Sequence, residues 1–198
     1  MDLPESNPIS QYIRIPKIFF SSDTGKPFSH CLMCAKFLLQ DGTAYMIEKA
    51  VKQHPEMNVT ETIFDYALCM DCAIKMNAAL SVESRERIGA YFAAHANLAE
   101  RREALLKKKT LRVQPWLSRC VIKNTPIAES PEYQLVAQFD GKHLLFTDMP
   151  FALSFAAMDE MGELMSEKSR GEMDDFIGKY FSGPPEVAEI LRKRLVLV

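Results

Sequence analysis

The sequence of this 198-residue chain predicts an α+β protein. Residues 59–68 are rich in β-branched and aromatic residues, which favour strands, and residues 133–147 place apolar side chains on one face of a hairpin. The second stretch carries Asp140-Gly141 at its centre, a dipeptide typical of the tight turn between paired antiparallel strands. After Pro150, by contrast, apolar residues recur at the spacing of one helix face. Strands and helices are therefore both expected, in separate segments of the chain.

Composition places the chain among ordinary globular proteins. It is 47% hydrophobic, with a net charge of -2 and a pI near 6.1, which argues against a protein wrapped wholly in nucleic acid. The first residues are polar and acidic and lack the features of a secretory signal. No apolar run approaches the roughly 18 residues that span a bilayer. We therefore expect an intracellular, cytoplasmic protein without a membrane partner.

Four of the five cysteines form two pairs with the same spacing, Cys31-Leu-Met-Cys34 and Cys69-Met-Asp-Cys72. A gap of two residues lets one turn aim both thiolates at the same metal ion, and a second pair completes a tetrahedral shell. Inside the cell, paired cysteines are metal ligands more often than disulfides. The sequence therefore predicts a structural Zn²⁺ site with the ligands Cys31, Cys34, Cys69 and Cys72.

Two other uses of these cysteines are open. A dithiol redox centre would place Cys-x-x-Cys within a βαβ pattern, and neither pair lies in one. An iron-sulfur cluster also takes four cysteines, with a less constrained spacing. Zinc is the preferred interpretation, because a redox dithiol leaves the second pair unexplained and an iron-sulfur cluster does not require this spacing. Because four cysteines leave no open coordination position, the site would stabilise the fold and not carry out chemistry.

The elements expected around the cysteine pairs have a recognisable order. Residues 41–47 are expected to turn into a strand, residues 59–68 form the second strand, and a helix begins near Asp71, so the second pair lies at its start. A cysteine turn, a hairpin and a helix in this order resemble the treble-clef group of zinc fingers, over about residues 28–80. The resemblance implies metal ligation by the four cysteines and fixes no activity.

The pattern on either side divides the chain into three parts. Residues 1–27 contain four prolines and are expected to form an extended N-terminal arm. Residues 28–112 would hold the zinc module and a long helix that begins after Ser81 and runs to about Lys109. The apolar face of that helix is expected to pack on its own domain; a homodimer through it is the alternative.

Residues 113–198 are predicted to form a small α+β unit, separated from the zinc module near Pro115. Its hairpin is expected to pair Phe139 with Lys142 around the Asp140-Gly141 turn. Helices are expected over residues 151–165, 172–181 and 185–194. The fold predicted for the whole chain is thus a treble-clef-like zinc module with a long helix, followed by a small antiparallel sheet with helices. We find no internal repeat beyond the two cysteine pairs.

No catalytic residue and no cofactor other than zinc is predicted. The chain lacks a GxSxG elbow, an HExxH sequence and a glycine-rich phosphate loop. Cys120 is expected within a strand, where a single cysteine is usually a small buried hydrophobe. An enzyme whose site is assembled from dispersed residues is the interpretation that one sequence leaves open.

One segment is strongly basic. Phosphate contacts are predicted for its cations, which are Arg101, Arg102, Lys107, Lys108, Lys109 and Arg112. The alternative is a solvated helix end, where cations complement the helix dipole. Aromatic residues that would stack on bases are missing from the segment.

The expected function is therefore that of a non-catalytic, zinc-binding interaction protein, an adaptor or assembly factor with a protein partner. The alternative is a zinc protein that binds RNA or DNA through the basic segment.

Overall fold

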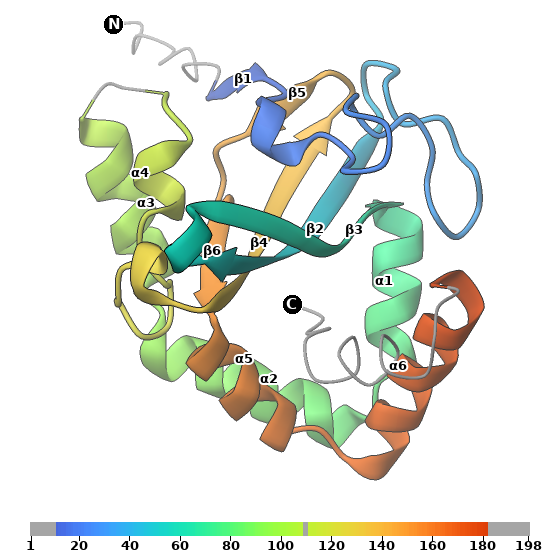
Figure 1. Cartoon of the computed structure of the whole chain (residues 1–198). Coiled ribbons are helices and arrows are strands. Elements are labelled where there is room, and N and C mark those ends of the chain that lie inside the picture. The colour runs from blue at the N-terminus through green and yellow to red at the C-terminus, as the bar shows by residue number, and fades with distance from the viewer. Residues whose placement is uncertain (1–10, 109–110, 182–198) are drawn as a thin grey trace, which may run out of the picture.

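The computed structural model describes residues 11–108 and 111–181 and has an α+β architecture, as predicted (Figure 1). Its strands form one six-stranded antiparallel sheet with the order β1-β5-β4-β2-β3, and β6 pairs with β4 beside β5. The strands are β1 Tyr12–Arg14, β2 Ala44–His54, β3 Val59–Cys69, β4 Glu132–Asp140, β5 His143–Leu145 and β6 Phe151–Ser154.

The helices curve around one end of the sheet (Figure 1). They are α1 Met70–Ala79, α2 Val82–His95, α3 Leu98–Lys107, α4 Gln114–Leu117, α5 Phe155–Glu163 and α6 Glu167–Tyr180. Among the described residues, no helix has both the length and the apolar composition needed to cross a membrane. The helix predicted over residues 185–194 lies outside the described part of the chain.

The long strands β2 and β4 lie side by side at the centre of the sheet. They come from opposite sides of Pro115, near which the sequence predicts a boundary between two units. Side chains from both strands fill the core, and Tyr45 and Phe139 stack with their ring centroids 5.1 Å apart. The sheet is thus continuous across the predicted boundary, while the division of the chain into domains stays a prediction.

The hairpin predicted around Asp140-Gly141 is present, but its turn is shifted by one residue, so that Phe139 pairs with Leu144 and not with Lys142. Asp140 pairs with His143, so the turn consists of Gly141 and Lys142. The backbone N–H of Gly42 donates a hydrogen bond of 2.6 Å to Asp140 Oδ1, which holds this residue at the end of β4. Gly141 has φ 51, and a Cβ there would lie 2.9 Å from the Gln40 carbonyl oxygen. The turn therefore requires glycine at its first position.

The long helix predicted after Ser81 is divided into α2 and α3. Helix α2 ends at His95, and Ala96 adopts an extended conformation. Asn97 then begins α3, because its side chain accepts a hydrogen bond of 3.1 Å from the Glu100 backbone N–H. The apolar pattern runs across the break, so only the cap at Asn97 signals in the sequence that a new helix begins.

The two longest helices cover strands that are distant in the sequence. Helix α2 packs against β6, where Phe92 and Phe151 have ring centroids 6.0 Å apart. Helix α6 packs against β3, where Tyr66 and Phe176 lie 5.7 Å apart. In Figure 1, accordingly, α2 lies beside α5 and α6 lies beside α1. Each half of the chain thus places a helix on the other half.

Candidate metal centre

The first cysteine pair lies in a tight turn before β2. The Cys31 N–H donates to the Lys36 carbonyl, and the Ala35 N–H donates to the Cys31 carbonyl, both at 2.9 Å. Ala35 closes the turn with φ 57, a left-handed conformation that costs an alanine more than a glycine. We call residues 31–36 the cysteine turn. Its backbone directs the side chains of Cys31 and Cys34 to the same side.

The second pair lies where β3 passes into α1. Cys69 is the last residue of β3 and the N-cap of α1, and Cys72 lies in the first turn of that helix. The Leu32 N–H donates a hydrogen bond of 2.9 Å to the Ala67 carbonyl, which fixes the cysteine turn against the end of β3. The two pairs are thus brought together by backbone contacts.

The four sulfur atoms form a compact cluster. All four Sγ atoms lie within 4.8 Å of one another, and Cys34 Sγ is 3.7 Å from Cys69 Sγ. Zinc-sulfur bonds of about 2.3 Å in a tetrahedron place the sulfur atoms about 3.8 Å apart. Cys31, Cys69 and Cys72 are buried, and Cys34 is exposed. The structure thus groups the four predicted ligands in an arrangement that can hold a metal ion.

The protonation of the cluster differs between its members. Burial of the Cys31 thiol opposes ionisation, but hydrogen bonds from the backbone of Cys69, Cys34 and Met33 outweigh it and lower its pKa to about 7. Burial, together with the neighbouring thiols, raises the pKa of Cys69 and of Cys72. A bound cation would offset this opposition to ionisation, so that metal binding would release protons.

Comparison of the chain with protein-family models, with curated proteins and with solved structures finds no match. The function must therefore be argued from the site itself.

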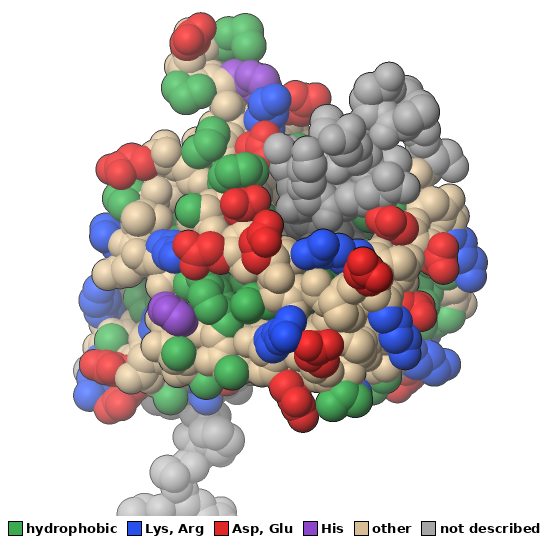
Figure 2. Space-filling view, turned by 90° about the horizontal axis from the view of Figure 1, so that it is seen from below, with side chains coloured by type: hydrophobic (Ala, Val, Ile, Leu, Met, Phe, Trp, Pro, Cys, Tyr) green, Lys and Arg blue, Asp and Glu red, His purple; other side chains and the backbone are tan. Residues whose placement is uncertain are grey.

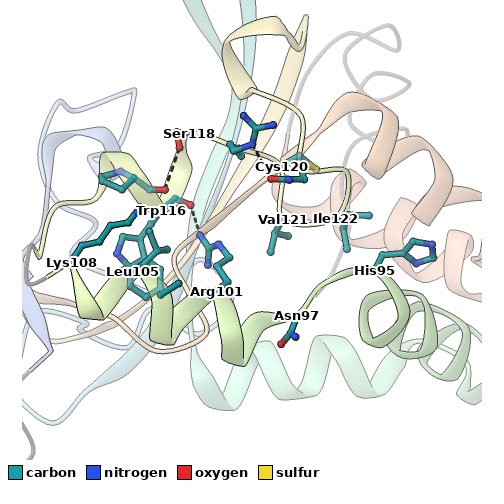
Figure 3. A pocket seen from close by; sticks show the side chains of 14 residues that line it. His95, Asn97, Arg101, Leu105, Lys108, Trp116, Ser118, Cys120, Val121 and Ile122 are labelled. Atoms are coloured by element: carbon teal, nitrogen blue, oxygen red, sulfur yellow. Dashed lines mark hydrogen bonds between the residues drawn. The ribbon is translucent and has the colours of Figure 1, made fainter.

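The predicted phosphate contacts are dispersed, and some of their cations are already engaged. Arg101 points inward: its guanidinium donates to the Trp116 and Pro150 carbonyls and lies 5.1 Å from the centre of the Trp116 ring (Figure 3). Burial lowers its pKa to about 10. Arg102 donates to Gln11 Oε1 at 3.4 Å, and Lys107 pairs with Glu103 at 2.7 Å. Arg101 thus holds α3 against the segment around Trp116.

Two of the other cations are exposed, and the third is not described. Lys108 and Arg112 extend into solvent, and Lys109 lies outside the described residues. A cavity of about 530 Å³ separates α3 from residues 115–124 (Figure 3). Lys108 lines it together with His95 and Arg119, and none of its lining residues is acidic. The sequence analysis did not single out Arg119, which follows the segment in the chain and reaches the cavity only through the fold.

Cys120 lies in a tight turn and not in a strand as predicted, although it is buried as expected. The turn runs from Cys120 to Thr125, and the Cys120 N–H donates to the Thr125 carbonyl at 2.8 Å. Its Sγ accepts hydrogen bonds of 3.3 Å from the backbone N–H groups of Lys123 and Ser154. The thiol is thus held by two backbone donors, although Cys120 also lines the cavity beside α3.

A buried carboxyl group was also missed by the sequence analysis. Glu48 lies in the middle of β2 with no exposed surface. Its Oε2 accepts hydrogen bonds of 2.7 Å from the Tyr66 hydroxyl and from Gln134 Nε2. Burial raises the pKa of Glu48 to about 7, against the opposing effect of these two donors.

Proposed function

We propose that Cys31, Cys34, Cys69 and Cys72 bind one structural Zn²⁺ ion, and that the chain is a non-catalytic interaction protein whose surface this ion stabilises. The observation that carries the proposal is the cluster of four sulfur atoms at tetrahedral spacing, contributed by two segments far apart in the sequence.

The geometry favours zinc over the alternatives. Sulfur atoms within 4.8 Å of one another enclose a single ion, whereas an iron-sulfur cluster places inorganic sulfide and several irons between the thiolates. A redox dithiol needs two cysteines and leaves the other two unexplained. The order of cysteine turn, hairpin and helix also agrees with the treble-clef zinc fingers that the sequence resembles.

The substitution Cys69→Ser tests the metal site. It replaces a ligand with a weaker one at the start of α1, so we expect loss of the bound ion and a marked fall in the melting temperature, because binding energy in such a site is folding energy. Metal analysis, the charge-transfer absorption of the cobalt-loaded protein and thermal unfolding measure these effects. Cys120→Ala, outside the cluster, is the control and should keep the ion. A folded Cys69→Ser protein with unchanged metal content and melting temperature would exclude the site.

A cavity next to the metal-bearing helix supports a protein partner. It measures about 320 Å³ and is lined by Met46, Met70, Met149 and Ile74, with Arg85 at its edge. Ile74 is 62% exposed although it is a large hydrophobic residue. Methionine side chains adapt to the shape of an inserted group. We expect a protein partner that inserts an apolar side chain here and places a carboxylate near Arg85.

Photo-crosslinking from position 77, whose Asn77 lines the same cavity, tests this partner site. A single crosslinked species of defined mass is expected. Ile74→Asp should remove it without changing the metal content, and Val82→Asp should keep it. Val82 is the matched control because its exposed fraction, 60%, is close to that of Ile74 and it does not line the cavity. Crosslinking that both substitutions leave unchanged would contradict the partner site.

The second candidate function is nucleic-acid binding, and the cation-lined cavity beside α3 favours it. The face shown in Figure 2 carries acidic and basic side chains side by side, so that face does not favour a polyanion. Phosphate contacts would therefore come from the exposed cations near α3, which are Lys108, Arg112 and Arg119. We expect binding of labelled RNA or duplex DNA that weakens with salt, because phosphate contacts release counterions.

Fluorescence anisotropy of the metal-loaded protein measures this binding. Lys108→Ala combined with Arg119→Ala should weaken it, whereas Lys107→Ala, which removes a cation already paired with Glu103, should leave it nearly unchanged. Equal effects of the two variants, or no binding at low salt, would reject this candidate.

A further inference from the structure

We propose that the chain contains an internal repeat, and that its second copy holds a latent metal site at Cys120, Lys123, Ser154 and Ala157, in which three of the four thiols have been replaced. The two copies span residues 29–95 and 118–180. The sequence analysis found no internal repeat beyond the two cysteine pairs; the proposal is based on hydrogen bonds, strand pairing and helix caps that the copies share.

The turn around Cys120 repeats the cysteine turn bond for bond. In the first copy, the Cys31 N–H donates to the Lys36 carbonyl, and in the second, the Cys120 N–H donates to the Thr125 carbonyl. The N–H of Ala35 or Asn124 closes each turn onto the carbonyl of its cysteine, and both residues have a positive φ, 57 and 52. Two unrelated turns would not be expected to share this set of bonds.

The two turns also dock on their strands in the same way. The residue after each cysteine, Leu32 or Val121, donates its N–H to the carbonyl of Ala67 or Ala152, each at 2.9 Å. Ala67 lies two residues before Cys69, and Ala152 lies two residues before Ser154. The docking therefore makes Ser154 the counterpart of Cys69.

The elements that follow the turns correspond in order. Strand β4 takes the place of β2, and β5 with β6 takes the place of β3 as its hairpin partner. Helix α5 takes the place of α1 and begins directly after Ser154, as α1 begins directly after Cys69. Helices α2 and α6 each have 14 residues and begin after Ser81 and Ser166.

The copies are related by an approximate twofold axis. Glu48 and Val136 are each the fifth residue of their strand, β2 or β4, and they lie opposite each other in the sheet. At the other end, Ser81 and Ser166 are joined through their hydroxyl groups at 2.9 Å. The Ser81 N–H donates to Ser169 Oγ and the Ser166 N–H donates to Ser84 Oγ, both at 2.9 Å. These bonds exchange under the axis, as does the packing of α2 on β6 and of α6 on β3.

The metal ligands of the first copy have clear counterparts in the second. Cys120 corresponds to Cys31, and Lys123 corresponds to Cys34. Ala157, three residues after Ser154, corresponds to Cys72. The Cys31 thiol accepts hydrogen bonds from the backbone of Cys34 and Cys69, and the Cys120 thiol accepts them from the backbone of Lys123 and Ser154.

Two of the three side chains at the lost ligand positions have other contacts, whereas the buried Ser154 hydroxyl has no hydrogen-bond partner among the described residues. Lys123 Nζ pairs with Glu160 at 2.5 Å, and Ala157 is fully buried. The second copy therefore keeps the backbone of a metal site, while amide hydrogen bonds and packing take the place of the ion.

Each copy has a cavity at an equivalent position of its two helices, but the side chains that line the two cavities differ. The methionine-lined cavity includes Ile74 and Arg85, whose counterparts Asp159 and Arg170 line a second cavity of about 290 Å³ between α5 and α6. Glu163 and Asp174 make this second cavity acidic. The copies thus offer similarly placed cavities to different ligands.

Restoring the thiols tests the latent site. The variant Lys123→Cys/Ser154→Cys/Ala157→Cys has four cysteines at the equivalent positions. Titration with Co²⁺ gives the number of ions bound per chain from the sulfur-to-cobalt charge-transfer absorption. We expect two Co²⁺ per chain for the variant, one for the unchanged protein, and one again when Cys120→Ala is added to the variant. A folded triple variant that binds no more Co²⁺ than the unchanged protein would overturn the proposal.

The test separates this proposal from that of the first metal site, because Cys69→Ser in the triple variant should leave the second ion bound. Ala157 is in the core, so a milder variant, Lys123→Cys/Ser154→Cys, keeps it and provides three thiolates. This variant should bind its second Co²⁺ at least tenfold more weakly than the triple variant. If neither variant gains an ion when refolded with excess Co²⁺, the repeat does not preserve a metal site and the proposal fails.

Discussion

Glu48 shows how a single residue can make the stability of this fold depend on pH. Its carboxyl group is fully buried and accepts hydrogen bonds from Tyr66 and Gln134, and burial raises its pKa to about 7 from an ordinary value of 4.5. Between these two values the folded protein holds a proton that the unfolded chain has lost. Stability therefore falls as the pH rises through this window.

We expect Glu48→Gln to remove this dependence. Each unit of pKa shift corresponds to about 1.4 kcal/mol, so the original protein should lose roughly 3 kcal/mol of stability relative to the variant between about pH 5 and about pH 8. Chemical denaturation of both proteins across this range measures the difference. Parallel stability curves would show that Glu48 titrates in the folded state as it does in the unfolded chain.

Residue patterns predicted the cluster of four cysteines but not the environment of Glu48. The two-residue gap between Cys31 and Cys34 is typical of a turn that directs both thiols to one metal ion, so a shared ion can be predicted without knowledge of the fold. The burial of Glu48 depends on which strands flank β2, and nothing local in the sequence states that. The environment of Arg101 was not predictable either, because its contacts with Trp116 and Pro150 form only when α3 packs against these later segments.

At the scale of elements, the helix caps determine where helices begin. The sequence predicted strands near β2 and β3, a helix near α1 and the hairpin of β4, because each has a local signal. It predicted one helix where α2 and α3 are separate, because an apolar repeat that continues across a break conceals it. Caps at Ser81 and Ser166 also link α2 with α6, through contacts between distant parts of the chain.

The two serine caps should contribute similarly to stability. Ser81→Ala and Ser166→Ala each remove an acceptor for a backbone N–H at the start of a helix, so each should cost about 1 kcal/mol. Because the two hydroxyl groups are in contact, the double variant should cost less than the sum of the two. Urea denaturation measures all three, with the exposed Ser118→Ala as a control. A loss confined to one of the caps would contradict the shared role.

At the scale of the whole molecule, the pairing of β2 with β4 joins segments on both sides of Pro115. The sequence suggested separate units there because a change of pattern is visible locally, whereas the choice of strand partner is not. Strand pairing over long distances depends on the combined packing of all elements, and this is the part of the fold that the sequence analysis could not predict.

Metal removal should therefore affect unfolding of the whole molecule. The continuous sheet predicts one cooperative transition, which a zinc chelator shifts to lower temperature without dividing it. Calorimetry with and without the chelator measures this, and circular dichroism followed at the same temperatures is the check on cooperativity. Two separate transitions, with only the first sensitive to the chelator, would instead support the predicted division near Pro115.

Helix α2 packs on β6 and helix α6 packs on β3, so each half of the chain covers strands of the other half. This packing has a consequence for synthesis on the ribosome. While the chain is being made, β3 and its Tyr66 emerge long before Phe176, the side chain that covers them. The cysteine turn and the start of α1 emerge early enough to meet an ion during this interval. If the nascent first half binds the proposed ion, the ion would keep β3 in place until α6 arrives and would limit the time during which an uncovered sheet can aggregate.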